Sequence, residues 1–500
     1  MVSPPSELRR GRTPRLGSNG VASASALNLR GRAVRGAVAL SGGNAFAYAF
    51  AFAATLVLAH LLTPRQFGQA ALAIAVVELL FVATAGSLSM ALIRESSNQI
   101  AAAFDVSLVL TVAVGLATLG LSSAIAGILW LTSSATLALM IIALAGGRVV
   151  LLVGYSYNAQ LERELLYTRV SINQFFATVV ASALALGLAR EGAGVWSLAT
   201  RDIAVSVLTF ALAYFASRFR FGWTFDRSLA KQQLVFGAQM VGSRIGDILF
   251  HRLDNLVVGI FSGTAQLGLY NQAYVLTEAG NRIMAPILQQ VPFAAYSRLQ
   301  NQRALTSEVF RTVTYFVVRG SAFLAAIFVA VPSPLLGALF GAPWRSAQII
   351  LVLLALYALL QPLFDHMRVL LVANGAVSSV LAARAAQLAF FVPTVILGAV
   401  AFGAVGASIA VGIGMLIGTA ALIRPSLRLV EFDLNGMLVP VAAAVVASVV
   451  GRYAASETTG DWERLGLGVA GATLAYGAVL AALDRRRLRA AVEILRTRAG

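Results

Sequence analysis

Long apolar segments constrain this chain more than any other feature of its sequence. Crossing the hydrocarbon core of a bilayer takes about 20 helical residues, and fourteen segments approach or exceed that length. Their approximate bounds are 37–60, 69–92, 104–130, 134–156, 170–189, 194–217, 235–261, 267–296, 312–332, 346–372, 376–400, 402–423, 436–453 and 464–482. Helices satisfy all their backbone hydrogen bonds internally, as a lipid environment requires. The sequence therefore predicts an all-α polytopic membrane protein with about 14 transmembrane helices.

The composition supports this class and excludes several others. Only 12% of the 500 residues are charged, about half the share found in soluble domains. There is no Cys and there are three His, which excludes disulfides, thiolate nucleophiles and Cys-based metal centres. The chain contains no D-x-D motif and no P-loop, so we expect a transporter rather than an enzyme. We predict no catalytic residues, no metal and no cofactor.

The basic residues are unevenly distributed between the predicted helices. A net charge of +17 would suggest a nucleic-acid partner in a soluble protein. Between the predicted spans, however, 26 basic residues fall on one side and five on the other, namely Arg65, Arg190, Arg345, Arg452 and Arg464. Basic loops are retained in the cytoplasm. Both termini are therefore predicted to be cytoplasmic, and the basic excess reflects membrane topology rather than nucleic-acid binding.

A short repeat suggests a duplicated architecture. Gln66 and Gly68 follow the first span, and Gln266 and Gly268 stand in the same relation to the seventh, 200 residues later. Six spans per unit is an even number, so a duplication would keep its orientation in the membrane. We predict two pseudo-symmetric six-helix lobes around a central cavity, plus two C-terminal helices. The predicted regions are a disordered basic cytosolic tail (1–35), an N-terminal lobe (36–217), a cytosolic linker (218–234), a C-terminal lobe (235–424), two extra transmembrane helices (425–483) and a basic cytosolic tail (484–500).

Arginines within the apolar segments are the first candidates for function. Charged residues are costly in hydrocarbon and usually face a cavity or a partner. The guanidinium stays charged and binds phosphate through a planar fork. We therefore predict a substrate-binding surface of cavity cations, made of Arg148, Arg244, Arg252, Arg282, Arg319 and Arg384. The alternative is local pairing, with Arg201 beside Asp202 and Arg282 four residues after Glu278, or extension of the side chains to the membrane interface.

The seventh predicted span carries a second cluster. Arg244, Asp247, His251 and Asp254 are spaced by three, four and three residues, which places them on one helix face. With Glu78, the residues Asp247, His251 and Asp254 form a candidate coupling-ion or proton site, since His titrates near neutral pH. The alternative is a self-neutralised structural cluster in which Arg244 pairs with Asp247 and Arg252 with Asp254. The pattern leaves both interpretations open.

Four short motifs, taken in order, resemble those of a transporter family. They lie at 62–68 (LTPRQFG), 159–165 (AQLEREL), 194–198 (GVWSL) and 254–274, which runs from DNLVVG to LGLYNQAY. Over residues 35–430 the chain resembles the polysaccharide (O-antigen or exopolysaccharide, Wzx-type) flippases of the multidrug/oligosaccharidyl-lipid/polysaccharide exporter superfamily. It departs from their pattern in the acids Glu162 and Glu164 and in Tyr167, which replaces a basic residue.

The resemblance implies a flippase working by alternating access. Its expected substrate is an undecaprenyl-diphosphate-linked oligosaccharide, moved from the inner to the outer leaflet of the bacterial cytoplasmic (inner) membrane for O-antigen, capsule or exopolysaccharide biosynthesis. The expected partners are this lipid-linked oligosaccharide and the bilayer, and the resemblance also allows polysaccharide polymerase and chain-length proteins. Two other functions stay open: a cation-coupled multidrug exporter of the same superfamily, and a polysaccharide polymerase or ligase, which the short outer loops disfavour.

Overall fold

The computed structural model describes residues 42–81, 87–94, 99–132, 134–300 and 302–485. Within these ranges every regular element is helical and no strand occurs. Among the described residues, ten helices are long and apolar enough to cross a membrane. The prediction of an all-α polytopic membrane fold is thereby confirmed.

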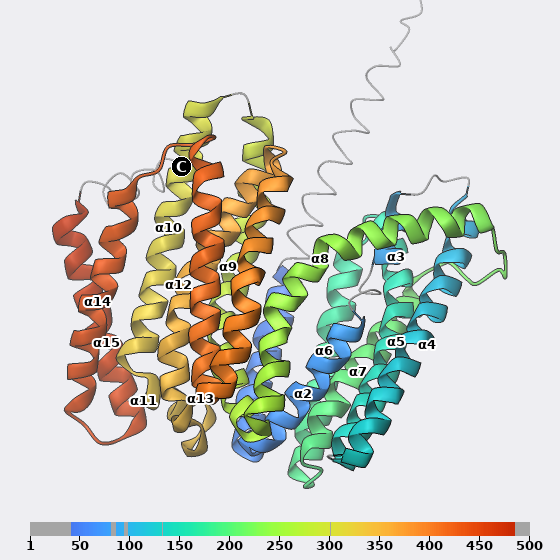
Figure 1. Ribbon diagram of the computed structural model, residues 1–500, viewed down its shortest axis with the longest axis horizontal. Coiled ribbons are helices and arrows are strands. Elements are labelled where there is room, and N and C mark those ends of the chain that lie inside the picture. The colour runs from blue at the N-terminus through green and yellow to red at the C-terminus, as the bar shows by residue number, and fades with distance from the viewer. Residues whose placement is uncertain (1–41, 82–86, 95–98, 133, 301, 486–500) are drawn as a thin grey trace, which may run out of the picture.

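The first group of helices, which we call the N-terminal helices, is shown in blue to green in Figure 1. It comprises Gly42–Leu61, α2 (Pro64–Leu80), α3 (Ser87–Arg94), α4 (Ile100–Thr132), α5 (Ala135–Arg163), α6 (Tyr167–Arg190) and α7 (Val195–Ala216). Thr63 caps α2, because its hydroxyl accepts the Gln66 N–H while the Gln66 side chain accepts the Thr63 N–H at 2.8 Å. This reciprocal pair is a capping box, and Pro64 at the first helical position completes the start signal.

The remaining helices are the connecting helix α8 and a second group. They are α8 (Arg227–Phe261), α9 (Gly263–Arg298), α10 (Arg303–Ala330), α11 (Pro332–Phe340), a short 3₁₀ helix (Ala342–Ala347), α12 (Gln348–Ala373), α13 (Val377–Leu427), α14 (Leu434–Ser456) and α15 (Asp461–Leu483). We call α9 to α15 the C-terminal helices. The two groups lie closest where α2 begins and diverge toward the opposite end of the molecule (Figure 1).

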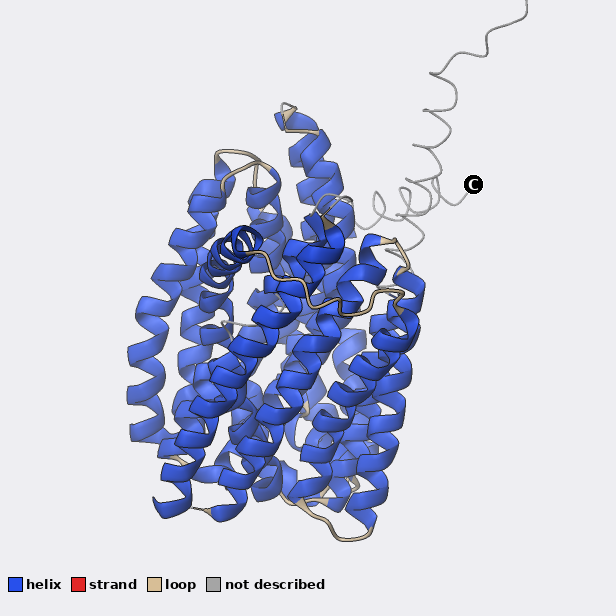
Figure 2. Cartoon of the chain, turned by 90° about the vertical axis from the view of Figure 1, so that its right-hand side faces the viewer, coloured by secondary structure: helices blue, strands red, loops and turns tan. Residues whose placement is uncertain are grey.

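The helix α8 connects the two groups. Its first part runs across the ends of α3 and α4, and its second part turns along α2 and α13 (Figure 1). The side view shows the loop before α8 on the outer side of the N-terminal helices (Figure 2). One helix is therefore shared between the two halves of the molecule.

The ten apolar helices do not correspond one to one with the fourteen predicted spans. The long helix α13 contains Gly403 in a non-helical conformation, so it covers the predicted spans 376–400 and 402–423. The predicted span 69–92 corresponds to α2 and α3 together, 235–261 corresponds to α8, and 267–296 corresponds to α9. None of these four helices is among the ten. The helices α2 and α3 have 17 and 8 residues and are too short to be counted. The helices α8 and α9 carry ionisable side chains, among them Asp247 and Glu278, which lower their hydropathy.

The starts of α2 and α9 cross in backbone contact. A Cβ atom on Gly68 would lie 1.6 Å from the Thr264 carbonyl oxygen, and one on Gly268 would lie 1.8 Å from the Pro64 carbonyl oxygen. No side chain fits between the two helices here, because the opposing atoms belong to the backbone. The Gln-x-Gly repeat therefore lies at the point where the two groups of helices approach each other most closely.

Trp344, on the 3₁₀ helix, extends this contact. Its side chain is fully buried, and its indole N–H donates to the Ala59 carbonyl at 3.0 Å. Its ring also packs edge-on against Phe67, with ring centroids 5.2 Å apart. Because Ala59 and Phe67 belong to the N-terminal helices, Trp344 ties the two groups together at the same end as the crossed glycines.

Candidate functional site

A cavity of about 690 Å³ lies between the helix Gly42–Leu61, α2, α7, α8 and α9. Small residues of the first two helices, including Ala51, Ala70 and Ala71, leave space for it. Phe67 lies at its wall and also contacts Trp344. Six charged side chains line the cavity: Glu78, Arg201, Asp202, Arg252, Glu278 and Arg282. Three cations and three acids therefore share one polar space between the two groups of helices.

Glu78 holds two arginines from different helices. Its Oε1 accepts from Arg148 Nη2 at 2.8 Å, and its Oε2 pairs with Arg252 Nε. Arg148 lies on α5, while Arg252 lies on α8, so the carboxylate joins α2 to both. Arg252 itself lines the cavity, whereas Arg148 reaches it only through Glu78. The alternative pairing of Arg252 with Asp254 is absent from the ion pairs of the described chain.

Arg201 was not among the predicted site residues, yet it lines the cavity. Its Nη1 donates to the Thr55 hydroxyl at 2.9 Å. In the part of the chain that the structure describes, no carboxylate lies within ion-pair distance of it, Asp202 included. Adjacent residues of a helix do not face each other. The neighbouring acid, which suggested a local pair, therefore does not neutralise this arginine directly.

Arg282 is both paired and open to the cavity. Its Nε lies 3.5 Å from Glu278 Oε2, at the i,i+4 spacing, and about half of its side chain is exposed. Its guanidinium also lies over the Tyr48 ring, 5.1 Å from the centroid. Arg282 therefore forms the predicted local ion pair with Glu278 and also lines the cavity.

The predicted polar face of α8 is divided among different partners. Asp247 pairs with Arg384 of α13 at 2.6 Å, and Arg384 also donates to Gln387 at 2.6 Å. Asp254 is fully buried and accepts from the Tyr270 hydroxyl at 2.5 Å. Neither Asp247, Asp254 nor Arg384 is among the residues that line the cavity. The side chain of Arg244 lies outside the described residues.

A chain of hydrogen bonds leads from α8 into the cavity wall. His251 Nδ1 lies 3.0 Å from the Tyr274 hydroxyl, which donates to the Tyr357 hydroxyl at 3.1 Å. The Tyr357 hydroxyl in turn donates to Glu278. Sequence reasoning missed this chain, because Tyr274 looks like an interfacial aromatic residue and nothing in the sequence places Tyr357 beside it. Of the predicted polar face of α8, His251 lines the cavity, as does its neighbour Arg252, which was not part of that face.

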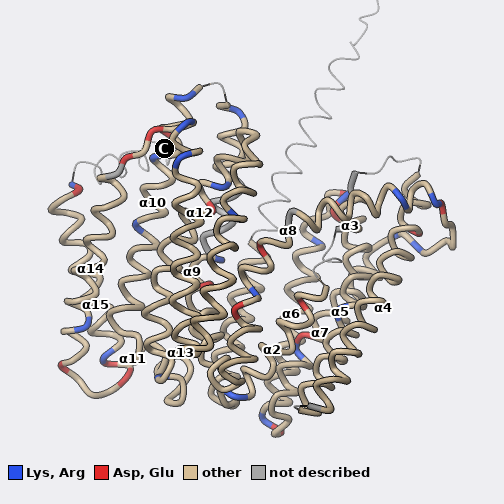
Figure 3. Tube along the Cα trace, viewed as in Figure 1, with Lys and Arg blue, Asp and Glu red and all other residues tan. Residues whose placement is uncertain are grey.

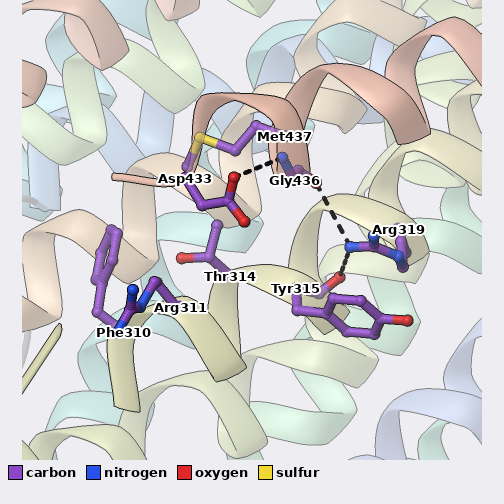
Figure 4. A pocket seen from close by; sticks show the side chains of 8 residues that line it. All are labelled: Phe310, Arg311, Thr314, Tyr315, Arg319, Asp433, Gly436 and Met437. Carbon is purple, nitrogen blue, oxygen red and sulfur yellow. Dashed lines mark hydrogen bonds between the residues drawn. The ribbon is translucent and has the colours of Figure 1, made fainter. Parts of the chain in front are cut away.

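Arg319 lies away from the cavity. It pairs with Asp484, just after α15, and its Nη1 donates to the backbone carbonyls of Tyr315 at 3.0 Å and Gly436 at 3.5 Å. Its guanidinium also lies 3.4 Å from the Tyr315 ring centroid. Figure 4 shows the small pocket beside it, whose volume of about 30 Å³ suits a single water. Arg319 therefore joins α10 to the last two helices.

Tyr476 supports the same junction and gives a first prediction. Its buried hydroxyl donates to the Arg319 carbonyl at 2.9 Å. We expect Tyr476→Phe to lower the free energy of unfolding by about 1 kcal/mol, the usual net value of such a bond. Thermal unfolding of the purified protein measures this. Tyr453→Phe, at an exposed position of α14, is the matched control, and an equal effect of both variants would contradict the assignment.

The described residues hold no group of three or more His, Asp or Glu side chains placed to bind an ion. The polar groups of the cavity are instead suited to binding an anionic or hydroxyl-rich molecule by hydrogen bonds and charge.

Comparison with known proteins identifies a matching protein family. The sequence profile of a family described as polysaccharide biosynthesis protein matches residues 57–349, more than half of the chain. The chain is 25% identical over 314 residues to the succinoglycan biosynthesis transport protein ExoT of Rhizobium meliloti, covering 61% of this chain and 62% of that protein. It is 27% identical over 243 residues to the teichuronic acid biosynthesis protein TuaB of Bacillus subtilis, covering 48% of each. The matches thus span less than two thirds of these two relatives.

Solved structures show the same fold. The lipid II flippase MurJ in an inward closed conformation superposes with a TM-score of 0.72 at 12% identity, over 90% of this chain and all of that one. An inward-facing multidrug resistance MATE family transporter of the MOP superfamily gives a TM-score of 0.59 at 17% identity, over 77% of this chain and 94% of that one. At these identities the likeness concerns the arrangement of helices alone.

Proposed function

Because the chain belongs to the polysaccharide biosynthesis protein family, we propose that it is a flippase for undecaprenyl-diphosphate-linked oligosaccharide. It moves this lipid from the inner to the outer leaflet of the bacterial inner membrane, for O-antigen, capsule or exopolysaccharide biosynthesis. The observation that carries the proposal is the cavity of about 690 Å³ with three arginines, enclosed by helices from both halves of the chain. A glycan needs such a polar route, because its hydroxyls would lose their hydrogen bonds to water in hydrocarbon.

The proposed phosphate-binding residues are Arg201, Arg252 and Arg282. Arg201 has no ion-pair partner among the described residues, so its charge is available to a diphosphate. Arg252 is held by Glu78, and an incoming diphosphate would compete with that carboxylate for the guanidinium. Arg282 is about half exposed, which leaves part of its fork open. The three acids keep the empty cavity near neutrality and so limit the cost of holding cations within the membrane.

The other predicted residues receive supporting roles in this proposal. Arg148 orients Glu78, while Arg319 and Arg384 hold helices together through Asp484 and Asp247. Arg244 stays a candidate for the substrate surface. Of the candidate coupling residues, Glu78 and His251 line the cavity and can respond to its contents. Asp254 is engaged by Tyr270, so its role is structural.

The proposal includes the architecture predicted from the sequence. It has fourteen transmembrane helices, two pseudo-symmetric six-helix lobes and both termini in the cytoplasm. The crossed glycines support the duplication, because their contacts are reciprocal. Gly68 packs against the Thr264 carbonyl, four residues before Gly268, and Gly268 packs against the Pro64 carbonyl, four residues before Gly68. In this orientation the closed end with Trp344 faces outward and the cavity serves the cytoplasmic side. Alternating access then requires the closed end to open. Polysaccharide polymerase and chain-length proteins are the proposed protein partners.

Deleting the gene and locating the lipid-linked glycan tests the function. A membrane-impermeant glycan-modifying reagent reports which leaflet holds the glycan. We expect it to accumulate on the cytoplasmic side and to return outward when the intact gene is supplied. Normal outward-facing glycan in the deletion strain would refute the flippase, and outward-facing single units that never lengthen would indicate a polymerase.

A cation-coupled multidrug exporter is the second candidate. The observation that favours it is the trio of acids in the cavity, Glu78, Asp202 and Glu278, which suits a cationic drug. The three arginines in the same space oppose such a substrate by like-charge repulsion. Cation-dependent dye efflux from vesicles containing the purified protein would support this candidate. If no efflux occurs, the exporter is refuted and the flippase remains as the proposed function.

A further inference from the structure

The turn between α7 and α8 carries a strained and outward-facing tryptophan. Asp105 of α4 is buried, with 3% of its surface exposed. Its carboxylate accepts the Gly222 N–H at 2.9 Å, the Thr224 N–H at 3.0 Å and the Thr224 hydroxyl at 2.6 Å. Trp223, between these two residues, has a φ of +60° and is 86% exposed. The carboxylate therefore holds the turn on both sides of the tryptophan.

This conformation is unusual for the residue that adopts it. The left-handed region is unfavourable for a residue with a Cβ atom, and glycine is the usual occupant of such positions. Strain of this kind persists where the surroundings enforce it, and it is often linked to function. Here the surroundings are the three hydrogen bonds to Asp105. Their effect is to direct a large apolar ring away from the protein, next to Phe221, whose ring centroid is 4.6 Å away.

Exposed cations and further aromatic rings surround Trp223. Arg218, Arg227 and Lys231 are exposed, and no carboxylate of the described residues lies within ion-pair distance of them. Figure 3 shows basic residues at the start of α8 and in the loop before it. Phe215 and Phe225 are 79% and 53% exposed.

The nearby charged groups leave these cations available. Arg220 donates to the Ser217 and Phe219 carbonyls at 2.8 Å and so caps the end of α7. The one acid in this stretch, Asp226, accepts the Ser228 N–H at 2.7 Å as the cap of α8. Exposed cationic and aromatic side chains are thus interspersed along residues 215–231.

We propose that residues 215–231 form an interfacial anchor that binds anionic phospholipid headgroups. The helix α7 is apolar enough to span the membrane and ends at Ala216, which places the following turn at the edge of the hydrocarbon. Tryptophan partitions to this depth, and cations near the surface attract anionic lipid. The anchor is fixed to α4 by Asp105 and by Gln233, whose amide donates to the Ala103 carbonyl at 2.9 Å. It therefore holds the N-terminal helices at a set depth in the membrane.

A lipid surface explains the observations better than an acidic protein. An acidic partner would account for the cations but not for three exposed aromatic rings beside the end of a membrane helix. The inference does not depend on the transported substrate, so its test is independent of the proposed function.

Fluorescence quenching in nanodiscs tests the anchor. The chain has five tryptophans, and subtracting the signal of a Trp223→Phe variant isolates Trp223. The probe is brominated phosphatidylglycerol at about one third of the lipid, compared with brominated phosphatidylcholine at the same fraction. We expect the phosphatidylglycerol to quench Trp223 at least about twofold more, because anionic lipid is enriched around the cations.

A charge variant and a matched control complete the test. Replacing Arg218, Arg227 and Lys231 with Gln should abolish the preference for phosphatidylglycerol and reduce the phosphatidylglycerol that co-purifies, counted by mass spectrometry. The control, R190Q with R452Q, removes exposed arginines elsewhere and should change neither result. Equal quenching by both lipids would refute anionic selectivity. A water-like Trp223 emission without quenching would refute the anchor and favour an acidic protein partner.

Discussion

Gly68→Ala is expected to abolish glycan export and to push the two groups of helices apart where α2 begins. The added Cβ would lie 1.6 Å from the Thr264 carbonyl oxygen, and neither atom belongs to a flexible side chain. Such overpacking usually costs about 1–3 kcal/mol, and more where only backbone can yield. Gly268→Ala should act in the same way, because its Cβ would lie 1.8 Å from the Pro64 carbonyl oxygen.

Two measurements check this expectation. Export is measured in the deletion strain carrying each variant. The separation is measured between spin labels on Leu61→Cys of the first helix and Ala265→Cys of α9, at exposed positions near the crossing in a chain without other cysteines. Gly120→Ala is the matched control, since its Cβ would meet no atom within 4 Å. Normal export with an unchanged label distance in Gly68→Ala would contradict the role of the crossing.

Removing one cavity arginine at a time is expected to reduce export by about tenfold or more in each of Arg201→Ala, Arg252→Ala and Arg282→Ala. A hydrogen bond to a charged group contributes about 1.5–3 kcal/mol, and tenfold corresponds to about 1.4 kcal/mol. The largest loss is expected for Arg201, whose side chain has, among the described residues, one hydrogen bond, to the neutral Thr55 hydroxyl. Arg201→Lys should restore part of the export, because the ammonium keeps the charge but not the bidentate fork.

The control separates binding from stability. Arg190→Ala removes an exposed arginine at the end of α6 and should export normally. Membrane content and thermal unfolding of each cavity variant must match those of the unchanged protein for a loss of export to count. Full export by all three cavity variants at normal membrane content would refute the phosphate-binding assignment.

Much of the fold could be predicted from local properties of the sequence. Apolar length predicted the helical membrane fold, and the breaks between apolar runs predicted the division of α13 near Gly403. The resemblance to polysaccharide flippases is confirmed by the family match over residues 57–349. The Gln-x-Gly repeat marked a real contact, although the sequence could not show that Gly68 and Gly268 meet each other. These properties depend on short stretches of chain, which is why they are legible without coordinates.

The partners of the charged residues were decided by the tertiary structure. Arg252 has an acid two residues away, yet it pairs with Glu78 of α2, and Arg319 pairs with Asp484, 165 residues later. A long arginine side chain can reach several acids, and the rotation and depth of each packed helix select among them. Trp223 is a further case, since only the buried Asp105 explains its exposed and strained position. Apolarity along a helix is a property of its own residues, whereas the contacts of its polar side chains depend on how distant helices pack.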